Sequence, residues 1–199
     1  MADNSRQAIL DQLRRTTLEP VALPDLRGPW TTSDDPRRQF AEVLAAVGGR
    51  AITVGSLAEV NAELEKIPAY QNARQICSRV AGIARANVDL DAAGDPHDLE
   101  KVDFFIAPGE FGVAENAAVW VTDESIKHRV LYFLTQHLAL VVPARELVSN
   151  MHEAYQRVKL GQRQFGLFLS GPSKTADIEQ SLVIGAHGAR SLTAFLVES

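Results

Sequence analysis

Apolar residues recur along the chain at two spacings, one typical of helices and one typical of buried strands. Phe40, Val43, Leu44 and Val47 follow the i, i+3, i+4, i+7 spacing of an amphipathic helix, and Asp35 is placed to cap it. The alternation of the two patterns predicts an α/β fold. Short apolar runs predict strands over residues 50–55, 102–107, 111–113, 118–122, 138–142, 165–169 and 192–197.

Further segments have helical spacing or helix-start signals. A capping box at Ser56 and Glu59 predicts a helix start. The run over 138–142 is continuously apolar, which is typical of a strand in a sheet covered on both faces. The remaining helices are expected near the N-terminus and over residues 72–85, 145–160 and 176–184.

Three prolines, Pro20, Pro24 and Pro29, interrupt the region between residues 18 and 33. This region is interpreted either as a surface strap or as an arm that docks a partner or a second copy. The pattern therefore divides the chain into an N-terminal helix and arm over residues 1–35 and one α/β domain over residues 36–199.

Composition narrows the possible functions. The 199 residues carry 20 basic and 25 acidic side chains, a net charge of −5, which argues against nucleic-acid binding. No apolar run approaches the ~20 residues of a membrane-spanning helix, and charges interrupt the N-terminus where a signal peptide would be apolar. A cytoplasmic location is expected. The single cysteine, Cys77, cannot hold an iron–sulfur cluster, which takes about four.

The loop after the strand at 165–169 is a candidate anion site. Ligands of open α/β sheets bind where strands end, and the first N–H groups of a following helix attract anions. Gly171 permits close approach of the backbone, Lys174 adds positive charge, and the hydroxyls are placed to cap the helix or bind a ligand. The alternative is a well-capped strand–loop–helix junction. The hydroxyl residues are Ser170, Ser173 and Thr175.

A second candidate is the turn over residues 185–190, in which Gly185 and Gly188 flank His187. The glycines indicate tight backbone geometry around an exposed imidazole. The alternative is a helix C-cap followed by an incidental histidine. The helix expected over 176–184 would place this turn and the preceding loop at opposite edges of a βαβ unit, which argues against a shared site.

Glu115 is a third candidate, because it stands among small residues over 112–118 and is available as a nucleophile or base. The alternative is a solvated turn glutamate. Asp177 and Glu179 follow the loop and could meet His187 in space. No pair of histidines has the spacing of metal ligands, so no dedicated metal site is expected.

Two segments, 170–179 and 182–188, resemble the signature of the LUD (lactate-utilisation) domain, and the resemblance is strongest to the lactate-utilisation protein C family. It extends over most of the chain from about Phe40 onward. Two positions depart from the family pattern. The Thr-Gly that usually follows the acidic turn residue is Asn116-Ala117 here, and the usual Gly-Pro after the histidine is Gly188-Ala189.

The resemblance implies the fold of the sugar-phosphate isomerase and CoA-transferase superfamily, a Rossmann-like, mostly parallel sheet covered by helices. It also implies membership of a three-protein system that oxidises L-lactate to pyruvate, in which the other two proteins carry iron–sulfur clusters. The leading hypothesis is a subunit without clusters that binds a small carboxylate or phosphorylated ligand. Lys174 and the loop N–H groups would contact the anion, and His187 would accept the proton of a 2-hydroxyl group, with Asp177, Glu179 and Gly188 nearby.

Two other hypotheses remain. The chain could be a free-standing CoA-transferase-like or isomerase-like enzyme, in which Glu115 attacks an acyl thioester. It could also be a binding or assembly module without chemistry of its own. The loss of Thr-Gly beside Glu115 favours the second of these.

Overall fold

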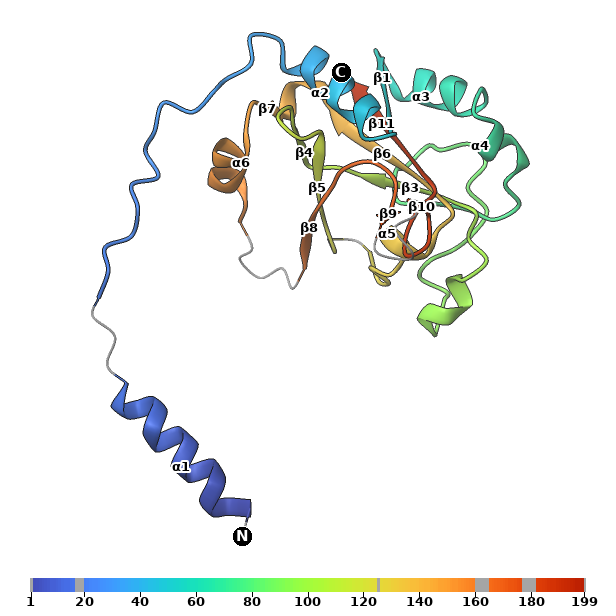
Figure 1. Ribbon diagram of the computed structural model, residues 1–199. Helices are drawn as coiled ribbons and strands as arrows, with labels where there is room; N and C mark the ends of the chain where they lie inside the picture. Colours follow the sequence, from blue (N-terminus) through green and yellow to red (C-terminus); the bar gives the residue numbers. More distant parts are fainter. Residues whose placement is uncertain (1, 17–19, 125, 160–164, 177–181, 199) are drawn as a thin grey trace.

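A five-stranded parallel sheet forms the centre of the computed structural model, which describes residues 2–16, 20–124, 126–159, 165–176 and 182–198. This architecture confirms the predicted α/β, Rossmann-like class (Figure 1). In order across the sheet, the strands are β1 (Arg50–Val54), β11 (Ser191–Val197), β6 (His137–Pro143), β3 (Phe104–Pro108) and β2 (Ile76–Ser78).

The side chains of β6 alternate between two separate cores, because successive residues of a strand point to opposite faces of the sheet. Leu138 and Leu140 pack into the larger core, whereas Ala139 and Val141 pack into the smaller one. The continuously apolar run is thus explained by burial on both faces, as predicted.

Helices cover the face with the smaller core. The helices are α3 (Leu57–Leu64), which begins at the predicted cap Ser56, and α4 (Pro68–Asn72). Val60, Leu64 and Tyr70 from these helices are buried against the sheet. On the other face, α2 (Pro36–Ala46) has the predicted cap and packs through Phe40 and Leu44.

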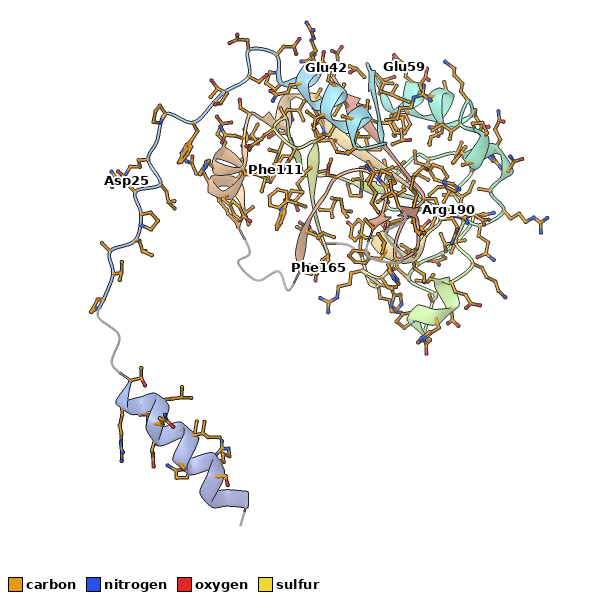
Figure 2. The ribbon with its side chains drawn as sticks, viewed as in Figure 1. Asp25, Glu42, Glu59, Phe111, Phe165 and Arg190 are labelled. Carbon is orange, nitrogen blue, oxygen red and sulfur yellow. The ribbon has the colours of Figure 1, made fainter. Side chains whose placement is uncertain are left out.

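A second, four-stranded sheet covers the rest of that face (Figure 1). Its order is β7 (Leu147–Val148), β4 (Phe111–Val113), β5 (Ala118–Thr122) and β8 (Gly166–Leu169). β5 is antiparallel to both β4 and β8. The outer face of this sheet packs on α6 (Met151–Arg157), with Phe111 and Trp120 in the layer between them (Figure 2 labels Phe111).

The N-terminal helix α1 (Ala2–Arg15) lies apart from all other elements, at the end of an extended arm (Figure 1). Side chains of the arm, such as Asp25 in Figure 2 and the apolar Leu23, are exposed. The arm joins the domain near α6, where the Trp30 and His152 rings stack and the Asn150 side chain donates to the Thr31 carbonyl. Among the described helices, none has the length and apolarity required to cross a bilayer.

The helix expected over 72–85 is wrong. Ile76 and Cys77 lie in β2, and both are buried, one in each core. Val80 and Ile83 follow in irregular backbone and pack against the smaller core. A short strand that is buried on both faces, followed by apolar loop residues, produces the same spacing as one side of a helix.

The long helix expected over 145–160 is also wrong in its first part. Residues 144–146 form a 3₁₀ turn, and Leu147–Val148 form β7, which pairs with β4. Helix α6 begins only after Asn150, whose side chain accepts from the Glu153 N–H, while the Glu153 carboxylate accepts from the Ser149 N–H. This capping arrangement is encoded in the sequence and marks the true helix start.

The helix expected over 176–184 is wrong where the chain is described. Lys174–Thr175 (β9) and Val183–Ile184 (β10) form an antiparallel pair, and Ala176 and Leu182 are not helical. Two short elements complete the fold, α5 (Leu131–Leu134) and a 3₁₀ turn over Pro96–Leu99.

Candidate functional site

The β9–β10 pair brings the 170–175 loop and the 185–190 turn together. The Ser173 N–H donates to the Ala189 carbonyl at 2.9 Å, and the Gly185 N–H donates to the Ser173 carbonyl at 3.0 Å. The argument that a helix holds these segments at opposite edges is therefore wrong, because antiparallel strands return the chain to its starting point. The two strongest sequence candidates lie side by side.

Gly188 is required for this approach. A Cβ at Gly188 would lie 2.9 Å from the Cβ of Ser173 and 3.3 Å from its Oγ. Gly171 has a positive φ of 68°, and a Cβ there would lie 2.9 Å from a Val47 methyl carbon, so the loop rests directly on the end of α2. The glycines position Ser173 beside the His187 turn.

A cavity of about 340 Å³, which we call the loop cavity, opens between these two segments. Leu138 and Leu192 form its floor, at the amino ends of β6 and β11 on the side that faces the second sheet. Phe168 and Leu169, at the carboxyl end of β8, also line it. Six residues predicted for the site line the cavity: Ser170, Gly171, Ser173, Lys174, His187 and Gly188.

The position of this cavity differs from the expectation for an open α/β sheet. β8 belongs to the second sheet, and the central strands contribute their amino ends rather than their carboxyl ends. Lys174 and Thr175 are extended, so the loop does not lead directly into a helix whose N–H groups could hold an anion. The Ser173 N–H already donates to the Ala189 carbonyl, so this N–H does not contact a ligand.

Lys174 lies between the cavity and the end of α2. Its side chain is exposed and lines the cavity, and its Cε would be 3.9 Å from a Cβ at Gly48. The C-terminal end of a helix favours a cation. Lys174 therefore lies beside the C-terminal end of α2 on one side and lines the loop cavity on the other.

Glu115 and Thr175 are not among the described residues that line the cavity. One carboxylate oxygen of Glu115 accepts from the Met151 N–H at 2.9 Å, at the start of α6. Thr175 pairs with Val183 in the hairpin. Ser170 joins the cavity to the Glu115 turn, since its hydroxyl donates to the Asn116 carbonyl at 2.7 Å. Asp177 and Glu179 lie outside the described residues.

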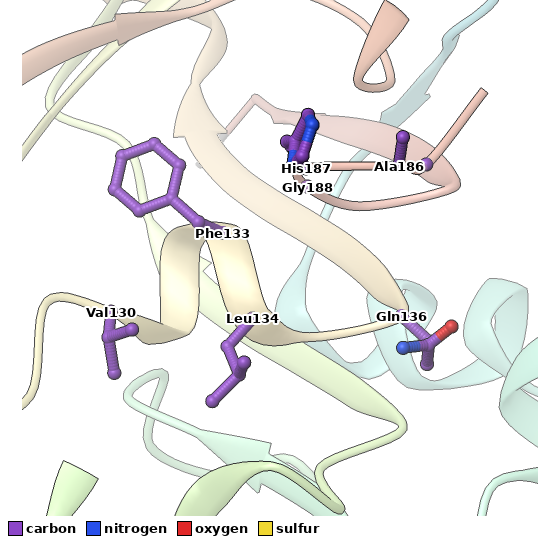
Figure 3. Close-up of a pocket in the computed structure, with 8 residues that line it drawn as sticks. Val130, Phe133, Leu134, Gln136, Ala186, His187 and Gly188 are labelled. Atoms are coloured by element: carbon purple, nitrogen blue, oxygen red, sulfur yellow. The ribbon is translucent and has the colours of Figure 1, made fainter. Parts of the chain in front are cut away.

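A second cavity of about 360 Å³, which we call the α5 cavity, adjoins the first. Figure 3 shows Val130, Phe133 and Leu134 on its α5 side and the His187 turn on the other. Phe133, His187 and Gly188 line both cavities. Sequence reasoning missed this α5 wall, because the run around residues 130–134 is continuously apolar and has no periodicity that indicates which side chain is exposed.

Two further features limit the chemistry. Within the described ranges, no three His, Cys, Asp or Glu side chains gather as a metal site requires. Cys77 is buried in the central sheet, and this burial raises the pKa of its thiol to about 11. That the whole chain has no metal site of its own stays a prediction, because it also concerns residues that the structure does not describe.

Comparisons with known proteins find relatives that cover most of the chain. The model of the LUD domain family matches residues 78–197. A protein named lactate utilization protein C from Geobacillus thermodenitrificans is 27% identical over 170 residues, covering 79% of this chain and 67% of that protein. The protein of the same name from Shouchella clausii is 32% identical over 115 residues, covering 53% of this chain and 50% of that protein.

A third relative of that name, from Geobacillus kaustophilus, is 28% identical, and the alignment covers 81% of this chain and 59% of that protein. The chain thus spans about half to two thirds of these curated relatives. Among solved structures, the crystal structure of a DUF162 family protein from Deinococcus radiodurans superposes with a TM-score of 0.62 at 18% identity. The superposition covers 81% of this chain and 96% of that one, which shows a shared fold.

Proposed function

The chain belongs to the LUD domain family, and from this premise we propose that it works in lactate utilisation by binding a small anionic 2-hydroxy acid in the loop cavity. Support for the pathway comes from the name that its relatives share, lactate utilization protein C. Support for the site comes from the hairpin, which brings Lys174, Ser173 and His187 to one cavity.

The single observation that carries the proposal is the close packing of the Ser173 loop on the His187 turn. It places an ammonium group, a hydroxyl and an imidazole around one space of about 340 Å³. A carboxylate is a natural partner for the Lys174 ammonium and the Ser173 hydroxyl. An imidazole exchanges protons near neutral pH, and we assign His187 to take the hydroxyl proton of the bound acid.

Oxidation of a 2-hydroxy acid to a 2-keto acid releases two electrons and two protons; His187 takes the hydroxyl proton, and the proton from C2 is released to solvent. This chain has one cysteine, which is too few for an iron–sulfur cluster. We therefore assign it the role of a subunit without clusters and assign electron acceptance to two iron–sulfur partner proteins in the cytoplasm. The work of this chain is to bind the acid, orient it and hold the hydroxyl proton.

The proposal is tested by titrating L-lactate into the purified chain in a calorimeter and by anaerobic lactate-dependent dye reduction with the partner proteins. We expect Lys174→Ala to weaken lactate binding at least tenfold. We expect His187→Ala to abolish dye reduction while leaving the melting temperature unchanged. Matched controls are Lys101→Ala and His97→Ala, both exposed and outside the cavity, which should behave as the unmodified chain.

The outcomes separate the remaining hypotheses. If dye reduction does not require this chain, the role in lactate oxidation is contradicted. If it requires the chain but proceeds at an undiminished rate with His187→Ala, the chain is a binding or assembly module instead. A CoA-transferase-like activity would require CoA exchange that is lost in Glu115→Ala.

A further inference from the structure

The two cavities adjoin each other. The loop cavity and the α5 cavity share three lining residues, Phe133, His187 and Gly188. Gly188 places no side chain between them, and His187, which lines both, is exposed. A ligand held beside His187 therefore has access to both.

The two parts differ in chemistry. The loop cavity offers Lys174 and the hydroxyls of Ser170 and Ser173. The α5 cavity is walled on one side by Val130, Phe133 and Leu134, and its described lining also includes Gln136 and His187 (Figure 3). The loop cavity can therefore hold an anion beside its apolar floor, and the α5 wall adds apolar surface for a ligand that extends past His187.

Phe133 is the exposed aromatic residue on the α5 side of the cavity. The residue is 41% exposed although it belongs to α5, whose neighbouring residues Leu131 and Tyr132 are buried. Burial of an aromatic ring is strongly favourable, and rings prefer to stack offset or edge-to-face on other rings. An exposed ring at the junction of two cavities is therefore a surface on which an aromatic ligand group gains contact.

The volumes of the two cavities also favour a ligand larger than lactate. Cavities of about 300–1,000 Å³ are typical of sites that enclose ligands much larger than lactate. Each of the two cavities, at about 340 and 360 Å³, falls in this range by itself. L-lactate, with a methyl group as its only apolar part, would leave the α5 cavity empty.

We propose that the site takes a 2-hydroxy acid with an aromatic side chain, whose carboxylate and hydroxyl lie in the loop cavity and whose ring lies in the α5 cavity against Phe133. This inference rests on the proposed function for the position of the carboxylate. It adds a class of substrate and a residue, Phe133, that selects it.

The test compares L-lactate with L-3-phenyllactate, which keeps the carboxylate and hydroxyl and adds a phenyl ring. Both acids are titrated into the full chain in a calorimeter. We expect phenyllactate to bind at least tenfold more tightly. In Phe133→Ala this preference should fall to less than threefold. Trp30→Ala is the control, because Trp30 is 42% exposed and lies outside both linings. It should keep the full preference.

Each other outcome overturns the inference in a distinguishable way. If lactate binds through Lys174 but phenyllactate binds no better, the aromatic class is wrong while the proposed function stands. If neither acid binds, both proposals fail. If Phe133→Ala keeps its melting temperature and the full preference for phenyllactate, the ring does not lie against Phe133. Phe133→Leu, which keeps an apolar side chain, should retain part of the preference.

Discussion

Ser173 and Gly188 approach each other so closely that a Cβ on Gly188 would lie 2.9 Å from the Cβ of Ser173. The contact joins two segments that the β9–β10 pair returns to the same place. Gly188 directly follows His187, so the contact brings the turn that carries His187 against the loop. The geometry of the candidate site therefore depends on the absence of a single side chain.

Replacing Gly188 with alanine should force the two segments apart. Overpacking of this kind costs about 1–3 kcal/mol. We expect Gly188→Ala to lower the free energy of unfolding by an amount in this range, measured by urea denaturation, and to weaken binding in the loop cavity. Removing the opposing side chain with Ser173→Gly in the same chain should recover part of the stability.

Gly94→Ala is the control for that measurement, because a Cβ at Gly94 has no described atom within 4 Å. It should leave the unfolding midpoint nearly unchanged. Equal effects of Gly94→Ala and Gly188→Ala would contradict a specific clash between Gly188 and Ser173.

Glu115 should act as a cap for α6 rather than as a nucleophile, because its carboxylate accepts from the Met151 N–H. Loss of a capping carboxylate costs about 0.5–2 kcal/mol. We expect Glu115→Ala to lower the unfolding free energy by an amount near the lower end of this range, without change in lactate binding measured by calorimetry. A stable Glu115→Ala chain that has lost ligand binding would restore Glu115 to the candidate site.

His137 should make the fold less stable in mild acid. Burial, assisted by the nearby Arg190 and opposed by Asp103, lowers the pKa of His137 below its ordinary value of 6.5. The unfolded chain therefore binds this proton more readily than the folded chain. The contribution of His137 is fully present above pH 6.5 and is lost as the pH falls through the lowered pKa of the folded state.

The measurement is the urea midpoint between pH 7.5 and pH 5 for the unmodified chain and for His137→Gln, which keeps a partner for the Ser191 hydroxyl. We expect the midpoint of the unmodified chain to fall more steeply. The comparison is necessary because hydrogen bonding to Asp95 raises the pKa of His97, and that group contributes with the opposite sign. Parallel curves for the two chains would contradict the prediction.

The stack of Trp30 on His152 should attach the end of the N-terminal arm to helix α6. The ring centroids are 3.6 Å apart with an angle of 5° between the planes. An aromatic pair contributes about 0.5–1.5 kcal/mol beyond its buried area. We expect Trp30→Ala to accelerate proteolytic cleavage of the arm while the unfolding midpoint of the domain changes little. Leu23→Ala, at an exposed arm position, should not accelerate cleavage.

Local sequence signals correctly predicted the helices that begin at a capping side chain. Asp35 and Ser56 both cap the helices that they were expected to begin. The wrong helices over 72–85 and 145–160 share one cause: short strands with buried residues, and the residues that follow them, place apolar side chains three or four positions apart. Around 176–184 the described elements are the mostly exposed strands β9 and β10, which pair with each other. At Ile76 and at Leu147 the partner strand, which is distant in sequence, decides the conformation.

The sequence by itself determined the α/β class, the position of most strands, and the family signature in residues 170–188. Only the tertiary structure decided that Ser173 meets Gly188, that the loop cavity lies at the amino ends of β6 and β11, and that Phe133 and His187 line the same two cavities. The physical reason is the separation in sequence over which each interaction acts. Capping and apolar alternation act between neighbours along the chain, whereas these contacts depend on how separate strands pair and on where one glycine leaves space.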